Sequence, residues 1–156
     1  MRFEEMAAEF AARTARITLC TVASVDGTGR PRTRMLHPIW EGTTGWIATR
    51  PGTLLEKHLA SNPHVSIQYW DQKRDKVIIE ARTQWADDPA TRHRIWELYK
   101  STPEPQGYDL GDGYFTGPDG ADFRLLKLNA WRIKLDGRPD AQGNLPFRGV
   151  WTANET

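Results

Sequence analysis

Residues 76–85 alternate between two sets of side chains, and this pattern constrains the fold more than any other part of the chain. Successive side chains of a β-strand point to opposite faces of its sheet. An apolar set on one face and a largely polar set on the other indicates a half-buried strand that lines a core. The core-facing set is predicted to be Val77, Ile79, Ala81, Thr83 and Trp85.

Five other segments have strand character: residues 17–24, 31–40, 46–50, 64–70 and 124–135. Asp26-Gly27 predicts a hairpin turn between the first two. Short helices are predicted near residues 3–11, over 53–60 and after Asp88-Pro89, and the Pro- and Gly-rich residues 101–123 predict a long loop. Strands in hairpin order with few short helices indicate a mainly β protein, a six-stranded antiparallel barrel.

The length and composition favour a single domain over residues 1–156 in the cytoplasm. Cys20 is the only cysteine, which excludes an intrachain disulfide and favours a reducing compartment. The N-terminus is acidic where a signal peptide would be basic, and every apolar run is too short to span a membrane. With 21 basic and 20 acidic residues, the chain has no broad attraction to nucleic acid. We expect neither nucleic acid nor a membrane among its partners.

Three arginines, at positions 30, 32 and 34, alternate along the second predicted strand. Residues two apart on a strand share one face, so the three guanidinium groups are expected to lie together. Such a face suits a phosphate or carboxylate partner. The alternative is a strand face that is simply solvated.

A second candidate site is the start of the helix at residues 53–60. Gly52 precedes it, and a helix N-terminus offers free N–H groups and a favourable dipole to an anion. Thr53 adds a hydroxyl and Lys57 a positive charge. The alternative is that Thr53 only caps the helix together with Glu56 and that Lys57 lies in water.

No catalytic residue and no metal site is assigned from the sequence. The four histidines lack a metal-ligand spacing within one element, although His37 lies only three residues after Arg34. Cys20 is interpreted as a small core residue.

The order of these features resembles the pyridoxamine 5'-phosphate oxidase-like family, and its general-stress-protein branch in particular. The resemblance covers roughly residues 8–135 and leaves 136–156 as a C-terminal tail. It implies a split β-barrel that binds FMN at the interface of a homodimer. The segments that carry it are Arg34-Met35-Leu36, Trp46-Ile47-Ala48-Thr49, Thr53, Lys57 and Asn62-Pro63.

The resemblance also implies roles for individual residues. Arg34, Met35 and Leu36 would contact the flavin and its phosphate. Ala48 and Thr49 would lie along the ring or ribityl chain, and Thr53 would face the phosphate. Lys57 would supply a cation near the phosphate, and Lys76 would stand near the flavin where the oxidases place a glutamine of the partner subunit.

Departures from the oxidases imply a substrate other than pyridoxamine phosphate. Leu54 and Leu55 replace an arginine and a lysine that grip the flavin phosphate, and Ile39 replaces a lysine that binds the substrate's phosphate. No segment after Leu135 matches the part of the oxidases that closes over pyridoxal phosphate.

The sequence therefore predicts an FMN-dependent oxidoreductase of an unidentified small substrate. Two alternatives stay open, because relatives of this family bind a deazaflavin coenzyme and others bind haem. The first is the same fold with a deazaflavin coenzyme, whose acidic tail suits the arginine-rich strand. The second is a non-catalytic protein that binds flavin or haem.

Overall fold

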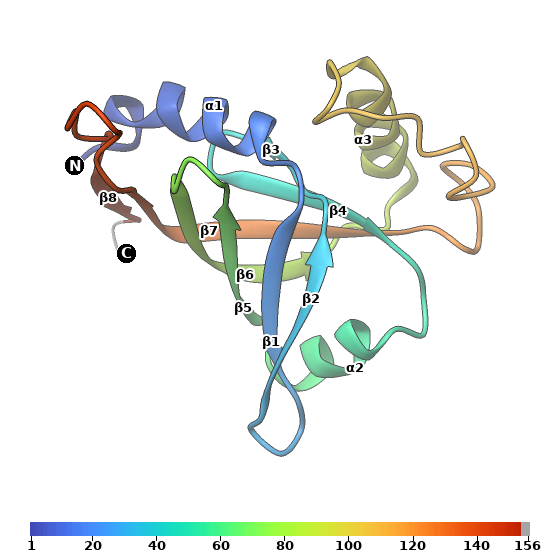
Figure 1. Cartoon of the computed structure of the whole chain (residues 1–156). Helices are drawn as coiled ribbons and strands as arrows, with labels where there is room; N and C mark the ends of the chain where they lie inside the picture. The colour runs from blue at the N-terminus through green and yellow to red at the C-terminus, as the bar shows by residue number, and fades with distance from the viewer. Residues whose placement is uncertain (154–156) are drawn as a thin grey trace.

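The computed structural model describes residues 1–153 as an antiparallel sheet of eight strands with short helices around it (Figure 1). The α-helices are α1 (Ala7–Arg16), α2 (Leu54–Ser61) and α3 (Pro89–Ser101), and a 3-10 turn, η1 (Phe3–Glu5), precedes them. The strands are β1 (Cys20–Val25), β2 (Pro31–Leu36), β3 (Ile39–Glu41), β4 (Thr44–Thr49), β5 (His64–Trp70), β6 (Lys76–Trp85), β7 (Arg124–Asp136) and β8 (Gly149–Thr152). The last three residues of the predicted tail lie outside the described part.

The strand order forces the sheet to curl into a split barrel. Seven strands follow the order β2-β1-β5-β6-β7-β4-β3, so β2 and β3 lie at opposite ends of this path. Only His37 and Pro38 separate these two strands in the chain. Because two residues cannot cross a flat sheet of seven strands, the two ends must come close together.

The mainly β antiparallel fold is confirmed, and the predicted count of six strands is wrong. The segment predicted as one strand over 31–40 is two strands, because Pro38 lacks the N–H that a continuous ladder needs. The polar tail also contains a strand, β8, which pairs with β7 through Ile133 and Trp151. The hairpin turn is confirmed, and Asp26 closes it by accepting N–H bonds from Thr28 and Arg30.

Helices α2 and α3 begin where the sequence predicts because each has a capping side chain. The Asp88 carboxylate accepts the N–H of Thr91 at 2.9 Å, and Pro89 occupies the first turn. Tyr99 then fixes α3 on the barrel by donating its hydroxyl to the Trp46 carbonyl at 2.8 Å. No helix in residues 1–153 is both long and apolar enough to cross a membrane.

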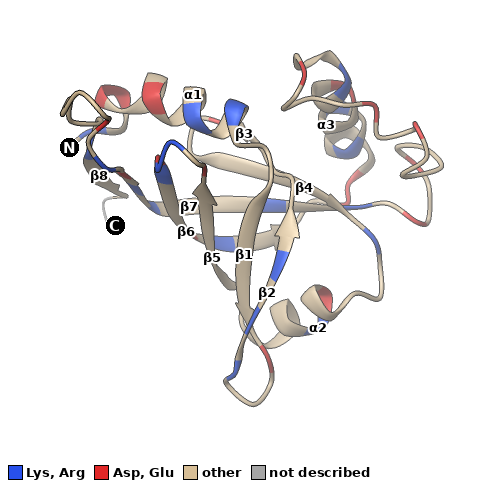
Figure 2. Cartoon of the chain, viewed as in Figure 1, with Lys and Arg blue, Asp and Glu red and all other residues tan. Residues whose placement is uncertain are grey.

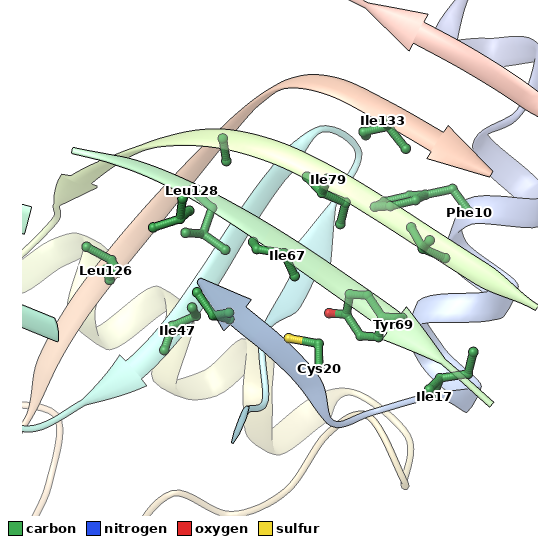
Figure 3. Packing of buried hydrophobic residues seen from close by; sticks show 14 of the residues in the cluster. Phe10, Ile17, Cys20, Ile47, Ile67, Tyr69, Ile79, Leu126, Leu128 and Ile133 are labelled. Carbon is green, nitrogen blue, oxygen red and sulfur yellow. The ribbon is translucent and has the colours of Figure 1, made fainter. Parts of the chain in front are cut away.

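The barrel interior is filled by apolar side chains that alternate along the strands (Figure 3). The alternation on β6 is confirmed, since Val77, Ile79 and Ala81 are fully buried. Cys20 lies in the same core, and burial raises the pKa of its thiol to about 12. It is therefore an unreactive core residue at neutral pH.

Arg13 is a buried charge that joins α1 to the strand ends and the tail. Its side chain is 1% exposed, and its guanidinium donates to the carbonyls of Lys76, Asp136 and Phe147 at 2.6–3.0 Å. The Glu9 carboxylate, one helical turn earlier, accepts from its Nε at 2.7 Å. Buried charges persist only with such complete pairing.

Candidate functional site

A cleft of about 610 Å³ opens between β2, the end of β4 and the start of α2. These segments are distant in sequence and meet because β2 and β4 lie near the seam where the barrel closes. Figure 2 shows basic residues on β2, which are arginines, next to α2. None of the described residues that line the cleft is acidic; they are Arg32, Thr33, Arg34, Leu36, Thr49, Thr53, Leu54, Leu55 and His58.

Arg34 is held rigidly in the wall of this cleft. Its Nη1 donates to the carbonyls of Val22 and Arg32 at 3.1 and 3.2 Å and to the Ser24 hydroxyl at 2.8 Å. Partial burial lowers the pKa of the guanidinium, but an arginine stays charged at any physiological pH. The N–H groups of Nε and Nη2 that do not bond to the protein remain for an anionic ligand.

His58 and Ser24 form a buried polar pair beneath Arg34 that the sequence did not point to. The residues are 7% and 1% exposed, and Ser24 Oγ lies 2.8 Å from His58 Nδ1. Nη2 of Arg34 lies 3.4 Å from the same nitrogen. The only sequence feature that could have indicated His58 is its position just over one helical turn after Thr53. That spacing gives no sign that its partner, Ser24, lies on β1.

The start of α2 contributes donors to the same cleft. Thr53 is the N-cap, and its hydroxyl oxygen accepts the N–H of Glu56 at 3.2 Å, so its own hydrogen is free to donate. The predicted capping box is only half formed, because the Glu56 carboxylate accepts from the N–H of Gly52. The first N–H groups of a helix have no carbonyl partner within the helix and suit an anion.

Four of the eight predicted cofactor residues line this cleft: Arg34, Leu36, Thr49 and Thr53. Met35 lies on the opposite face of β2, since neighbouring residues of a strand alternate, and its side chain is on the outside of the barrel. Side chains also alternate along β4, and Ala48 packs against the apolar cluster that includes Ile95, Trp96 and Tyr99 of α3.

The two predicted lysines do not line the cleft of their own chain. Lys57 is exposed on α2, and the next residue, His58, takes the position that faces the cleft. Lys76 lies at the start of β6, in a separate small pocket with Trp70, Arg74 and Arg138. Its predicted role is that of a partner-subunit residue and stays a prediction.

The two leucines at the helix start differ in their surroundings. Leu54 is 68% exposed at the rim of the cleft, whereas Leu55 is 5% exposed and packs in the barrel core. The cleft therefore has an apolar side chain at its rim, where the oxidases that the sequence resembles have cations that bind the flavin phosphate.

His37 lies outside the cleft lining, at the break between β2 and β3. Its Nε2 donates to the Gln106 carbonyl at 2.7 Å, and its ring packs against Tyr108. Burial lowers the pKa of this imidazole. Among residues 1–153, no three His, Cys, Asp or Glu side chains are close enough to hold a metal ion.

The geometry defines a split β-barrel with a cationic cleft at its seam. The sequence model of the pyridoxamine 5'-phosphate oxidase family matches residues 6–135, so the chain belongs to this family. The family binds flavins. No curated protein sequence matches the chain.

Solved structures show the same fold at low sequence identity. A Clostridium acetobutylicum protein related to general stress protein 26 of B. subtilis is 15% identical, with a TM-score of 0.73 and coverage of 96% of this chain and 95% of that chain. General stress protein 26 of Bacillus anthracis is 14% identical, with a TM-score of 0.66 and coverage of 83% and 93%. A protein named F420 reductase is 14% identical, with a TM-score of 0.56 and coverage of 78% and 93%.

Proposed function

We propose that the protein is an oxidoreductase that binds FMN with its phosphate in the cleft between β2, β4 and α2. The observation that carries this proposal is the convergence of donors there without any acidic lining residue. Arg34 presents a fixed charge, Thr49 and Thr53 present hydroxyls, and α2 begins at the same point. Charge-assisted hydrogen bonds of this kind are the strong ones.

The size and chemistry of the cleft fit such a ligand. Its volume of about 610 Å³ lies within the roughly 300–1,000 Å³ typical of small-molecule sites. Leu36, Leu54 and Leu55 supply apolar surface beside the donors. A flavin needs both, because its ring is flat and largely apolar while its phosphate is doubly charged.

Once bound, FMN supplies the capacity to accept or release a hydride, and the chain holds it in place. Arg34 neutralises negative charge on the cofactor at a position fixed by Ser24 and the β1 backbone. We propose a small substrate other than pyridoxamine phosphate, since Ile39, at the position where the oxidases place a substrate-binding lysine, is an apolar side chain that is only 2% exposed.

We also propose that the protein works as a homodimer in the cytoplasm, with the cofactor at the interface. Cys20 is the only cysteine of the sequence, so the chain has no intrachain disulfide, which supports a reducing compartment. The outer face of the sheet carries large exposed apolar side chains, which a second copy would cover. Lys76 of the partner would then complete the site.

A deazaflavin coenzyme is the second candidate, and one observation favours it. Arg32 lines the cleft beside Arg34, and Arg30 extends the positive charge from there along the β1–β2 hairpin, where an acidic tail would lie. Arg32 is only loosely neutralised, by Asp26 at 3.3 Å. The protein named F420 reductase shares this fold.

Titration of the protein with FMN, a deazaflavin coenzyme and haem, side by side, tests the proposal. We expect saturable FMN binding that dialysis reverses, because the rim lacks the two cations. Tighter binding of the deazaflavin would move that candidate ahead. Binding of haem alone would overturn both and leave the non-catalytic alternative.

A further inference from the structure

The polar pair beneath Arg34 fixes which nitrogen of His58 carries the proton. Arg34 donates to Ser24 Oγ, so the single hydroxyl hydrogen of Ser24 is directed to His58 Nδ1, 2.8 Å away. Nη2 of Arg34 is a second donor near that nitrogen, at 3.4 Å. Because two donors face Nδ1, it acts as an acceptor, and a neutral imidazole then holds its hydrogen on Nε2.

The remaining polar atom of His58 faces the cleft. Within residues 1–153, no fully buried side-chain nitrogen or oxygen lacks a hydrogen-bond partner. Nε2 has no protein partner there, so this nitrogen must itself be accessible although the residue is only 7% exposed. His58 lines the cleft, and the accessible edge of its ring therefore opens into it.

We propose that His58 donates its Nε2–H to the phosphate of a flavin bound in the cleft, and that Ser24 is the positioning residue that holds both His58 and Arg34. This inference rests on the proposed function and names a phosphate contact within that same site. It also explains how the site could bind a phosphate with leucines at positions 54 and 55. His58, one turn further along α2, would supply a hydrogen-bond donor in place of one of the missing cations.

The test compares FMN with riboflavin, which is the same molecule without the phosphate. Affinities of both are measured by flavin fluorescence for the parent protein and for His58→Leu, His58→Gln and Ser24→Ala. The control is His93→Leu, because His93 is exposed and pairs with Asp119 on the far loop. Thermal melting of each variant shows that it is folded.

We expect His58→Leu to weaken FMN binding about tenfold or more, while riboflavin binding changes little, because only the phosphate contact is lost. His58→Gln keeps an N–H donor and should recover part of the preference. Ser24→Ala should also lower the ratio of FMN to riboflavin affinity, and the control should leave it unchanged. An unchanged ratio in His58→Leu would overturn the inference.

A parent protein that binds neither flavin would refute the proposed function without deciding the role of His58. The imidazole ¹⁵N signals of His58 in the parent protein are then followed during titration with inorganic pyrophosphate. A saturable shift of Nε2 supports an anion contact at this residue, and its absence overturns the inference. The same spectra test the Nε2–H form directly, and Ser24→Ala should abolish that preference.

Discussion

Single residues decide how strongly this cleft can hold a phosphate. One fixed arginine, Arg34, stands in its wall, while the first residue of α2 is Leu54, 68% exposed at the rim. The helix dipole alone contributes only about 0.3–1 kcal/mol. The affinity for a phosphate should therefore be lower than in a site with several cations. Adding one cation to the rim should then raise this affinity measurably.

Leu54→Arg is expected to tighten FMN binding by roughly tenfold, since a hydrogen bond to a charged group contributes about 1.5–3 kcal/mol. Stability should hardly change, because the replaced side chain is already exposed. Isothermal titration of parent and variant with FMN measures the gain. Ala60→Arg is the matched control, because it adds the same charge to the exposed end of the same helix. An equal gain in both would mean that general charge attraction, and not a cleft contact, is responsible.

At the scale of elements, the sequence correctly predicted those features that depend only on a local residue pattern. The alternation on β6, the turn at Asp26-Gly27 and the capped starts of α2 and α3 all depend on neighbouring residues, and each is present. The strand β8 was missed because Gly149–Thr152 is short and polar in part, and it becomes a strand only by pairing with β7. Tertiary context of this kind overrides local propensity.

Arg13 provides a test of how elements are joined. Arg13→Ala should lower the free energy of unfolding by about 3–5 kcal/mol, because three partly buried carbonyls and Glu9 would lose a charged hydrogen-bond donor, each such bond contributing about 1.5–3 kcal/mol. Urea denaturation followed by tryptophan fluorescence measures the change. Arg16→Ala is the control, since Arg16 forms surface ion pairs with Asp71 and Asp75, each of which contributes about 1 kcal/mol or less. Similar losses in both variants would refute the assigned role of Arg13.

For the molecule as a whole, the sequence indicated which segments form the site but not all of the residues that belong to it. Arg34 and Thr53 were predicted from strand and helix patterns, and both line the cleft. Ser24 and His58 lie 34 positions apart, and no local pattern connects them. Barrel closure brings them together, so their pairing could be seen only in three dimensions.

The outer face of the sheet leads to the prediction about assembly. Thr21 pairs with both Met35 and Gln68, so these residues share one face, and Trp70 lies on the same face two residues further along β5. Tyr69, between Gln68 and Trp70, is fully buried, which makes this face the outer one. Met35 and Trp70 are 58% and 55% exposed in the single chain. Large apolar side chains with this exposure are expected where a second subunit would cover them.

We expect light scattering to give twice the chain mass for the parent protein and a single chain mass for the double variant Met35→Glu/Trp70→Glu. Each chain would then bury two carboxylates at the interface, and their desolvation disfavours association. The monomer should also bind FMN more weakly if Lys76 of the partner subunit completes the site. Leu145→Glu, which changes a 74% exposed residue of the tail, should leave both mass and affinity unchanged. A parent protein that is monomeric at micromolar concentration would contradict the shared site, and a double variant that stays dimeric would place the interface on another face.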